Sequence, residues 1–217
     1  MPSLSLHHLS KAPTTKTDGK PPVIILLHGY GSDENDLFPF AEELPEKYHI
    51  ISARAPHAMQ PYGNAWYDIY IDAAGVKASD NEGAKASRDL IATFIDEVVK
   101  EYDLDPFNVT LLGFSQGTIL SYAVALTYPE KVKNIIGLSG YINEEIIDVK
   151  SAAAYKHLSF YNSHGSVDQV IPIDAARKTP PFLKELGIES TLSEFPVGHG
   201  VHPTNFYELR DWLAKQA

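Results

Sequence analysis

The sequence predicts one doubly wound α/β domain spanning residues 1–217, with a mostly parallel sheet and helices on both of its faces. Apolar runs of strand length alternate along the chain with longer segments of helical period, the pattern of parallel strands joined by helical crossovers. The length of 217 residues suits one domain. No internal repeat, low-complexity tract or interdomain linker divides it. Right-handed crossovers between the strands are therefore expected.

The first half of the chain contains two predicted strands and one long helix. The β-branched run 23–27 follows two prolines and predicts a buried strand. We expect a helix with its apolar face over 37–44 and a second strand over 48–52. Segment 54–81 has no clear period but contains four aromatic residues, which favours an ordered loop packed over a site. The apolar stripe of 82–102 predicts a helix.

The second half repeats the alternation with shorter segments. Strands are expected over 109–113, 132–138, 158–162 and 190–195, and helices over 119–128, 173–186 and 204–215. Pro180 and Pro181 interrupt the second of these helices and predict a kink there. The segment between residues 138 and 158 is too short for a large helical lid.

Composition narrows the classes of partner and site. The formal net charge of −10 provides no basic field to attract nucleic acid or an anionic membrane. The chain has no cysteine, which excludes disulfides, thiolate metal sites and a cysteine nucleophile. No signal peptide and no apolar stretch of transmembrane length are recognisable, so we expect a soluble, cytoplasmic protein without stable membrane insertion.

The strongest chemical signal is Gly-Phe-Ser-Gln-Gly at 113–117, which lies between a predicted strand and a predicted helix. A G-x-S-x-G sequence in this setting is typical of a nucleophile elbow, where a sharp turn holds a serine hydroxyl above the sheet. We therefore predict Ser115 as a nucleophile. The alternative is a glycine-rich turn with an incidental serine.

A nucleophilic serine needs a general base and an acid that orients the base. On this scaffold the acid and then the histidine follow the serine along the chain. Asp168 lies in a loop just after a predicted strand, which makes it the preferred acid. Asp174 would fall in the first turn of the following helix, where it favours the helix dipole. Asp148 precedes the strand and so lies at the wrong end of the sheet.

Three histidines compete for the role of base. His199 lies between two glycines after the last predicted strand and is preferred. His202 directly precedes Pro203, where a helix is expected to begin, so it suits a capping or surface role. His164 precedes the acid and violates the expected order.

Two backbone N–H groups are predicted to bind the oxyanion. One is that of Gln116, directly after the nucleophile, and the other is that of Tyr30, in the His-Gly-Tyr-Gly loop after the first central strand. His28 is expected to brace this loop by hydrogen bonds. Aromatic candidates for an apolar acyl surface are Trp66, Tyr67 and Tyr141, although aromatic residues occur at least as often in cores.

Taken together, these motifs resemble the carboxylesterase, lysophospholipase and acyl-protein thioesterase family of small α/β-hydrolases. The matching segments are 25–31, 65–68, 112–117, 164–168 and 198–199. The resemblance implies an α/β-hydrolase fold and a Ser115–His199–Asp168 triad, with Tyr30 and Gln116 as oxyanion donors. The family's loop often reads His-Gly-Leu-Gly-Asp, whereas this chain has Tyr30 and Ser32.

The predicted reaction is cleavage of a small-molecule carboxylic ester or thioester through an acyl-enzyme, with no metal and no organic cofactor. An acyl-protein thioesterase, or a peptidase or amidase on the same scaffold, is an alternative within enzymes. A catalytically silent binding protein that keeps the fold is the alternative outside enzymes. Nucleotide binding is not favoured because the chain lacks both glycine-rich phosphate-binding patterns.

Overall fold

The computed structural model describes residues 4–71 and 77–216, whose centre is a seven-stranded sheet with the order β1-β3-β2-β8-β9-β10-β11. The strands are β1 His8–Lys11, β2 Val23–Leu27, β3 His49–Ala53, β8 Val109–Phe114, β9 Asn134–Leu138, β10 Ser159–Gly165 and β11 Leu192–Phe195. All neighbouring pairs are parallel except β1 and β3. The predicted mostly parallel sheet is therefore confirmed.

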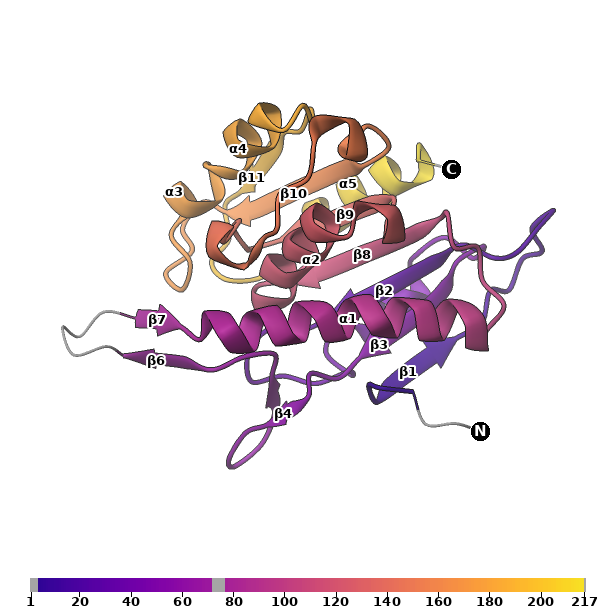
Figure 1. Cartoon of the computed structure of the whole chain (residues 1–217), viewed down its shortest axis with the longest axis horizontal. Helices are drawn as coiled ribbons and strands as arrows, with labels where there is room; N and C mark the ends of the chain where they lie inside the picture. The colour runs from indigo at the N-terminus through magenta and orange to yellow at the C-terminus, as the bar shows by residue number, and fades with distance from the viewer. Residues whose placement is uncertain (1–3, 72–76, 217) are drawn as a thin grey trace.

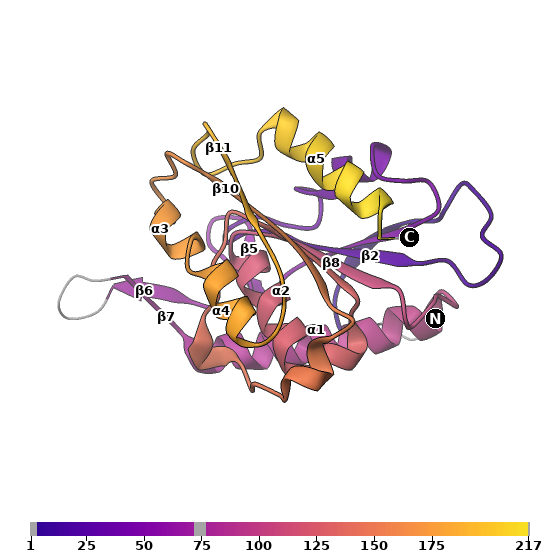
Figure 2. The ribbon, with the colours of Figure 1, turned by 90° about the horizontal axis from the view of Figure 1, so that it is seen from above.

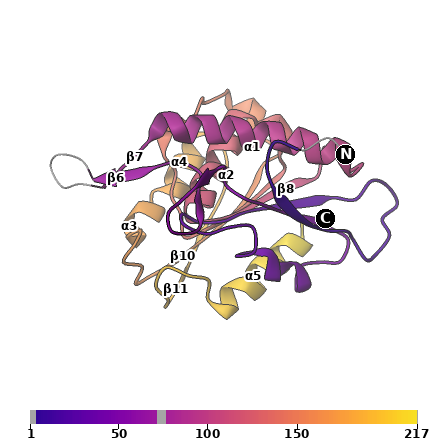
Figure 3. The same cartoon turned by 90° about the horizontal axis from the view of Figure 1, so that it is seen from below.

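Helices cover both faces of the sheet. One face carries α1 (Asn81–Glu101), α2 (Gln116–Thr127) and α4 (Thr179–Glu185), while α5 (Pro203–Ala214) lies on the other (Figures 1, 2 and 3). Two apolar clusters correspond to these layers, because side chains of each strand alternate between the faces. The predicted doubly wound architecture is confirmed, and no large lid is present among the described residues.

Helix α2 is the most deeply buried element that carries the site. Each of its residues is buried, because α2 lies between the sheet and α1. Its apolar residues are not confined to one stripe, as expected for a helix without a solvent face. Ser115, the residue before α2, is consequently fixed at the end of β8, the central strand of the sheet.

Three expectations about elements need correction. The N-terminal strand β1 was not predicted; it is a short, half-exposed edge strand that pairs antiparallel with β3. The helix expected over 37–44 is a single 3₁₀ turn, η1 (Phe38–Glu42), with a proline in its first turn. Strand β10 extends to Gly165, three residues beyond the predicted end. This extension places His164 inside the sheet.

The loop expected over 54–81 contains two small hairpins. Strand β4 (His57–Ala58) pairs with β5 (Asn64–Ala65), and β6 (Ile69–Ile71) pairs with β7 (Lys77–Ser79). Strands β6 and β7 project together from the body of the molecule (Figure 1). These strands are too short to show a period-two pattern in the sequence. Residues 72–76 of the predicted loop lie outside the described residues.

The helix expected over 173–186 is divided, as its prolines suggested, but at a different place. Helix α3 (Ile173–Ala176) ends before Arg177, and α4 starts at Thr179, so the prolines stand in the first turn of a new helix. A proline is tolerated there because the first-turn N–H groups have no partner within the helix. No helix among the described residues is both long and apolar enough to cross a bilayer.

Candidate active site

Ser115 stands on a strained turn between β8 and α2. Its φ of 54° and ψ of −115° lie in a region that side-chain-bearing residues rarely adopt. Glycines on either side make the turn possible: a Cβ on Gly117 would lie 2.0 Å from the carbonyl oxygen of Leu27. The N–H of Ser115 donates to the carbonyl of Leu138 at 2.9 Å, which ties the turn to β9. The serine hydroxyl is thus held at the carboxyl edge of the sheet.

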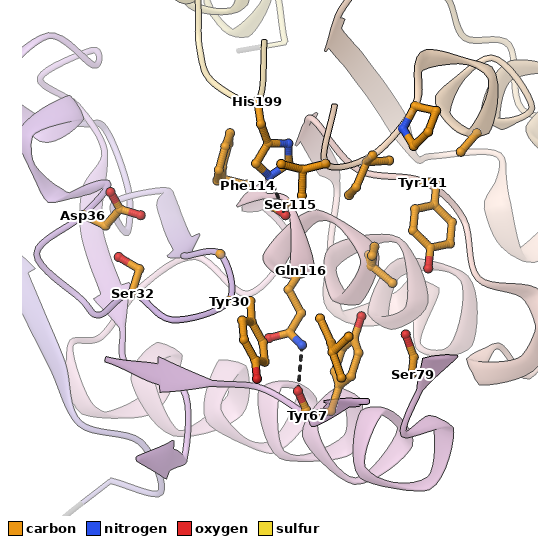
Figure 4. A pocket seen from close by; sticks show the side chains of 17 residues that line it. Tyr30, Ser32, Asp36, Tyr67, Ser79, Phe114, Ser115, Gln116, Tyr141 and His199 are labelled. Atoms are coloured by element: carbon orange, nitrogen blue, oxygen red, sulfur yellow. Dashed lines mark hydrogen bonds between the residues drawn. The ribbon is translucent and has the colours of Figure 1, made fainter. Parts of the chain in front are cut away.

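The structure brings the three predicted catalytic side chains together. Nε2 of His199 lies 2.9 Å from Oγ of Ser115 (Figure 4), and Nδ1 of His199 lies 2.7 Å from Oδ2 of Asp168. Ser115 follows β8, Asp168 follows β10 and His199 follows β11, so all three stand at the carboxyl ends of parallel strands. This edge is where open α/β sheets bind ligands.

Asp168 is held as a carboxylate although its side chain is fully buried. Burial raises the pKa of Asp168, but hydrogen bonds from His199 and from the amides of Ile171 and Val170 outweigh this and lower the pKa below its ordinary value. The two amides donate to Oδ1 at 3.0 and 2.8 Å. Oδ2 remains to accept the Nδ1 hydrogen of His199, which leaves Nε2 free to accept the serine proton.

The rival candidates have other partners. Asp174 is exposed in the first turn of α3 and pairs with Arg177. Asp148 pairs with Arg88. His202 caps α5, where its Nδ1 accepts from the N–H of Thr204 at 3.2 Å.

The two expected oxyanion donors border the same cavity as Ser115. Tyr30 follows β2 and Gln116 begins α2, and β2 is the direct neighbour of β8 in the sheet. Within residues 4–71 and 77–216, neither amide N–H is bonded to an acceptor. Both donors are available to a ligand oxygen, as an oxyanion hole requires.

His28 braces the loop that contains Tyr30. Its Nδ1 donates to the carbonyl of Gly29 at 2.7 Å, and its Nε2 accepts from the N–H of Ala55 at 3.0 Å. Both ring nitrogens are engaged only in the neutral Nδ1–H form, and burial lowers the pKa of His28 in agreement with that form. The loop is thereby fixed to the segment after β3.

A cavity of about 370 Å³ surrounds the Ser115 hydroxyl and differs in character between its two sides. Residues that follow β9 and β10 form a mostly apolar part of its lining, namely Tyr141, Val170, Ile171, Pro172 and Ala175, to which Ile119 of α2 and Ile69 of β6 add. Towards β2 it is bordered by Ser32 and Asp36 (Figure 4). Ser115 lies between these sides, because β8 separates β2 from β9.

Of the aromatic residues predicted to contact substrate, Tyr67 and Tyr141 line this cavity and Trp66 does not. Trp66 is fully buried in the core, where its Nε1 donates to the carbonyl of His28 at 2.9 Å. Its expected substrate contact is therefore corrected to a structural one. The sequence motif located the right segment, but neighbouring residues of an extended chain point to opposite sides.

Residues missed from the sequence include Val170 and Ile171, which hold Asp168 by their amides and also line the cavity. Their position directly after an aspartate is a signal for such a turn, since aspartate side chains often accept from the backbone two residues on. Across the described ranges, no three His, Asp or Glu side chains gather as ligands for a metal ion would.

A strained serine between a strand and a buried helix, followed along the chain by an aspartate and a histidine bonded in series, defines an α/β-hydrolase. The chain belongs to the phospholipase/carboxylesterase family, which matches residues 12–217.

Individual relatives agree with this assignment. An acyl-protein thioesterase 1 from Kluyveromyces lactis is 30% identical to this chain, with 97% of this chain and 95% of the relative covered. The solved carboxylesterase from Bacillus cereus has a TM-score of 0.84 at 20% identity and covers 98% of this chain and 95% of its own. For the carboxylesterase from Mesorhizobium loti the TM-score is 0.83 at 22% identity, with coverage of 99% and 97%. These two structures share the fold.

Proposed function

We propose that the protein hydrolyses carboxylic esters through an acyl-enzyme intermediate on Ser115. The observation that carries the proposal is the continuous series of hydrogen bonds from Ser115 through His199 to Asp168, beside an apolar cavity. A serine hydroxyl is a weak nucleophile alone, and this arrangement supplies both the base and the group that orients it. Membership in a family of carboxylic ester hydrolases supports the same reaction.

In the first step, Oγ of Ser115 attacks the carbonyl carbon while its proton passes to Nε2 of His199. The carbonyl oxygen becomes an oxyanion, and the free N–H groups of Tyr30 and Gln116 are the donors proposed to stabilise it. The bond from carbon to the leaving oxygen then breaks, and His199 returns the proton to that oxygen. The alcohol departs and the acyl group remains on Ser115.

In the second step, His199 takes a proton from a water molecule, whose oxygen attacks the acyl-enzyme. The same two N–H groups stabilise the second oxyanion. Ser115 leaves with the proton from His199, and the carboxylic acid is released. Throughout, Asp168 holds Nδ1–H of His199 and stabilises the imidazolium form.

The two sides of the cavity suggest how a substrate lies. The apolar side, which includes Tyr141 and Ile171, suits the acyl chain because it removes hydrocarbon from water. The side of Ser32 and Asp36 suits a polar leaving group, since an exposed carboxylate favours hydroxyl groups or a positive charge. The oxyanion donors and Ser115 stand between the two.

The test is hydrolysis of p-nitrophenyl esters with acyl chains from two to sixteen carbons, by the wild type and by Ser115→Ala. The wild type is expected to turn over these esters and to be labelled on Ser115 by a fluorophosphonate, with both lost in Ser115→Ala. Esterase activity that survives in Ser115→Ala would contradict the mechanism. Absence of both turnover and labelling in the folded wild type would support a silent binding protein instead.

Thioester cleavage is the second candidate, favoured by the Kluyveromyces lactis relative named as an acyl-protein thioesterase. The acyl-enzyme is the same for both substrates, so only the leaving atom differs. The rates of hydrolysis of an oxygen ester and a thioester with the same acyl group distinguish an esterase from a thioesterase. Faster turnover of a p-nitroanilide than of the matching ester would defeat both in favour of an amidase.

A further inference from the structure

His164 is a buried histidine beside the proposed triad that the reaction steps do not use. It stands at the end of β10, four residues before Asp168, and its side chain is fully buried. Nε2 of His164 lies 2.8 Å from the carbonyl oxygen of Ile171 and 3.3 Å from Oδ2 of Asp168. A buried histidine nitrogen that faces a carbonyl oxygen and a carboxylate oxygen is expected to donate to them.

These contacts determine which nitrogen carries the hydrogen. The neighbours of Nε2 are two oxygen acceptors, so a lone pair on Nε2 would be repelled, and Nε2 must be protonated. Nδ1 is buried and has no hydrogen-bond partner among the described residues. A buried nitrogen without a hydrogen-bond partner lowers the stability of the folded protein. This cost indicates that the Nε2–H group of His164 has a role beyond packing.

His164, Ile171 and Asp168 each contact the other two. Ile171 donates through its N–H to Oδ1 of Asp168, and its carbonyl accepts from Nε2–H of His164. The Nε2–H group of His164 also directs its positive end towards Oδ2 of Asp168. This is the oxygen that accepts from Nδ1 of His199. One residue, Ile171, is therefore fixed at both ends between His164 and the carboxylate.

A further charged residue close to His164 is Glu194, its register partner across the β10–β11 pair. Glu194 is engaged by Arg177, with distances of 2.8 Å from both Nε and the terminal nitrogen of the guanidinium. It therefore does not compete with Asp168 for the hydrogen of His164.

We propose that His164 is a positioning residue for the reaction: through Ile171 and by its direct contact with Oδ2, it fixes the carboxylate of Asp168 that orients His199. The proposal rests on the proposed function, since it assumes that His199 acts as the base. Ile171 also lines the cavity, but its contacts with His164 and Asp168 are made by its backbone.

Three substitutions at one position separate positioning from packing. His164→Gln places an amide N–H near the location of Nε2, His164→Asn is too short to do so, and His164→Phe keeps a ring but removes the donor. We expect His164→Phe and His164→Asn to lower kcat by about ten- to hundredfold with KM changed little. His164→Gln should retain most of kcat.

The pH profile is a readout that packing alone would not move. Without the N–H of His164, the charge of Asp168 acts more strongly on His199 and favours its imidazolium form. The acid limb of the kcat/KM profile is therefore expected at higher pH in His164→Phe and His164→Asn, and near its wild-type position in His164→Gln. His49→Phe is the matched control, because His49 is a buried histidine at the other end of the sheet, bonded to Ser10.

Equal kcat and equal pH profiles in His164→Gln and His164→Asn would overturn the proposal, and so would wild-type kinetics in folded His164→Phe. If neither Phe nor Asn variant folds, the ¹⁵N shifts of the wild-type histidines decide, because a His164 with unprotonated Nε2 contradicts the proposal. Wild-type protein without Ser115-dependent hydrolysis would instead refute the proposed function. The two failures are thus distinguishable.

Discussion

The side-chain oxygen Oε1 of Gln116 accepts a hydrogen bond of 2.9 Å from the backbone N–H of Trp66. Nε2 of the same side chain donates to the carbonyl of Tyr67 at 2.8 Å. The residue after the nucleophile therefore holds the segment that forms one wall of the cavity, while its own N–H stays free for the oxyanion. Ser87 secures this segment from the other side by donating to the carbonyl of Trp66.

Replacing Gln116 by leucine is expected to lower both stability and activity. The substitution leaves the buried N–H of Trp66 and the carbonyl of Tyr67 without partners, each at a cost of about 1–3 kcal/mol. Urea denaturation should show this loss, and kcat/KM should fall because Tyr67 lines the cavity. Gln60→Leu is the control at an exposed position. A Gln116→Leu protein as stable and active as Gln60→Leu would contradict the bridging role.

The close packing of the nucleophile turn predicts that Gly117 cannot be replaced. In Gly117→Ala the added Cβ would lie 2.0 Å from the backbone oxygen of Leu27, which no side-chain rotation relieves. Either α2 or β2 must shift, and we expect loss of fluorophosphonate labelling at Ser115 together with a lower melting temperature. Gly19→Ala is the matched control, since its Cβ would meet no atom within 4 Å. Normal labelling of Gly117→Ala would show that the turn is less constrained than its contacts imply.

The sheet could be predicted because its strands are apolar and its crossovers follow one rule. All five residues of Val23–Leu27 are buried, so the run in the sequence and the strand coincide. Ser115, Asp168 and His199 could be proposed together since parallel strands place their following residues at one edge. The order of the elements thus determines which distant residues meet.

Other features depend on contacts that no local pattern encodes. Trp66 and Tyr67 are adjacent aromatic residues in one motif, yet only Tyr67 reaches the cavity. Neighbouring residues of an extended chain point to opposite sides, and hydrogen bonds from Gln116 and Ser87, about 20 to 50 residues away, hold the backbone of this segment in place. Similarly, the role of His164 requires knowing that β10 continues to Gly165 and that Ile171 folds back over it.

His28 predicts a dependence of stability on pH. Burial lowers the pKa of His28, so the unfolded chain, whose histidine has an ordinary pKa of 6.5, binds a proton before the folded protein does. The contribution of His28 to the free energy of unfolding is fully present above the unfolded-state pKa of 6.5 and is lost as pH falls towards the folded-state pKa. In urea denaturation, the free energy of unfolding of the wild type should exceed that of His28→Gln by more at about pH 7.5 than at about pH 5.5. An equal or larger difference at the lower pH would contradict the neutral, doubly bonded imidazole.

Asp36 predicts a preference among leaving groups that does not depend on the acyl chain. Its carboxylate borders the cavity on the side of β2, and no cation within the described part of the chain forms an ion pair with it. A thiocholine ester places a positive charge in the leaving group, whereas a neutral thioester of the same acid does not. The ratio of their kcat/KM values is expected to fall about two- to fivefold in Asp36→Asn, the size of an exposed charge interaction. Added salt should reduce the wild-type ratio in the same direction because it screens exposed charges.

The matched control for this preference is Asp33→Asn. Asp33 carries the same charge three residues earlier, but its side chain accepts from Asn35 and does not line the cavity. A general effect of net charge would lower the ratio equally in both variants, whereas a leaving-group contact lowers it mainly in Asp36→Asn. Equal ratios in Asp36→Asn and the wild type would mean that the leaving group departs by another route, away from the side of β2.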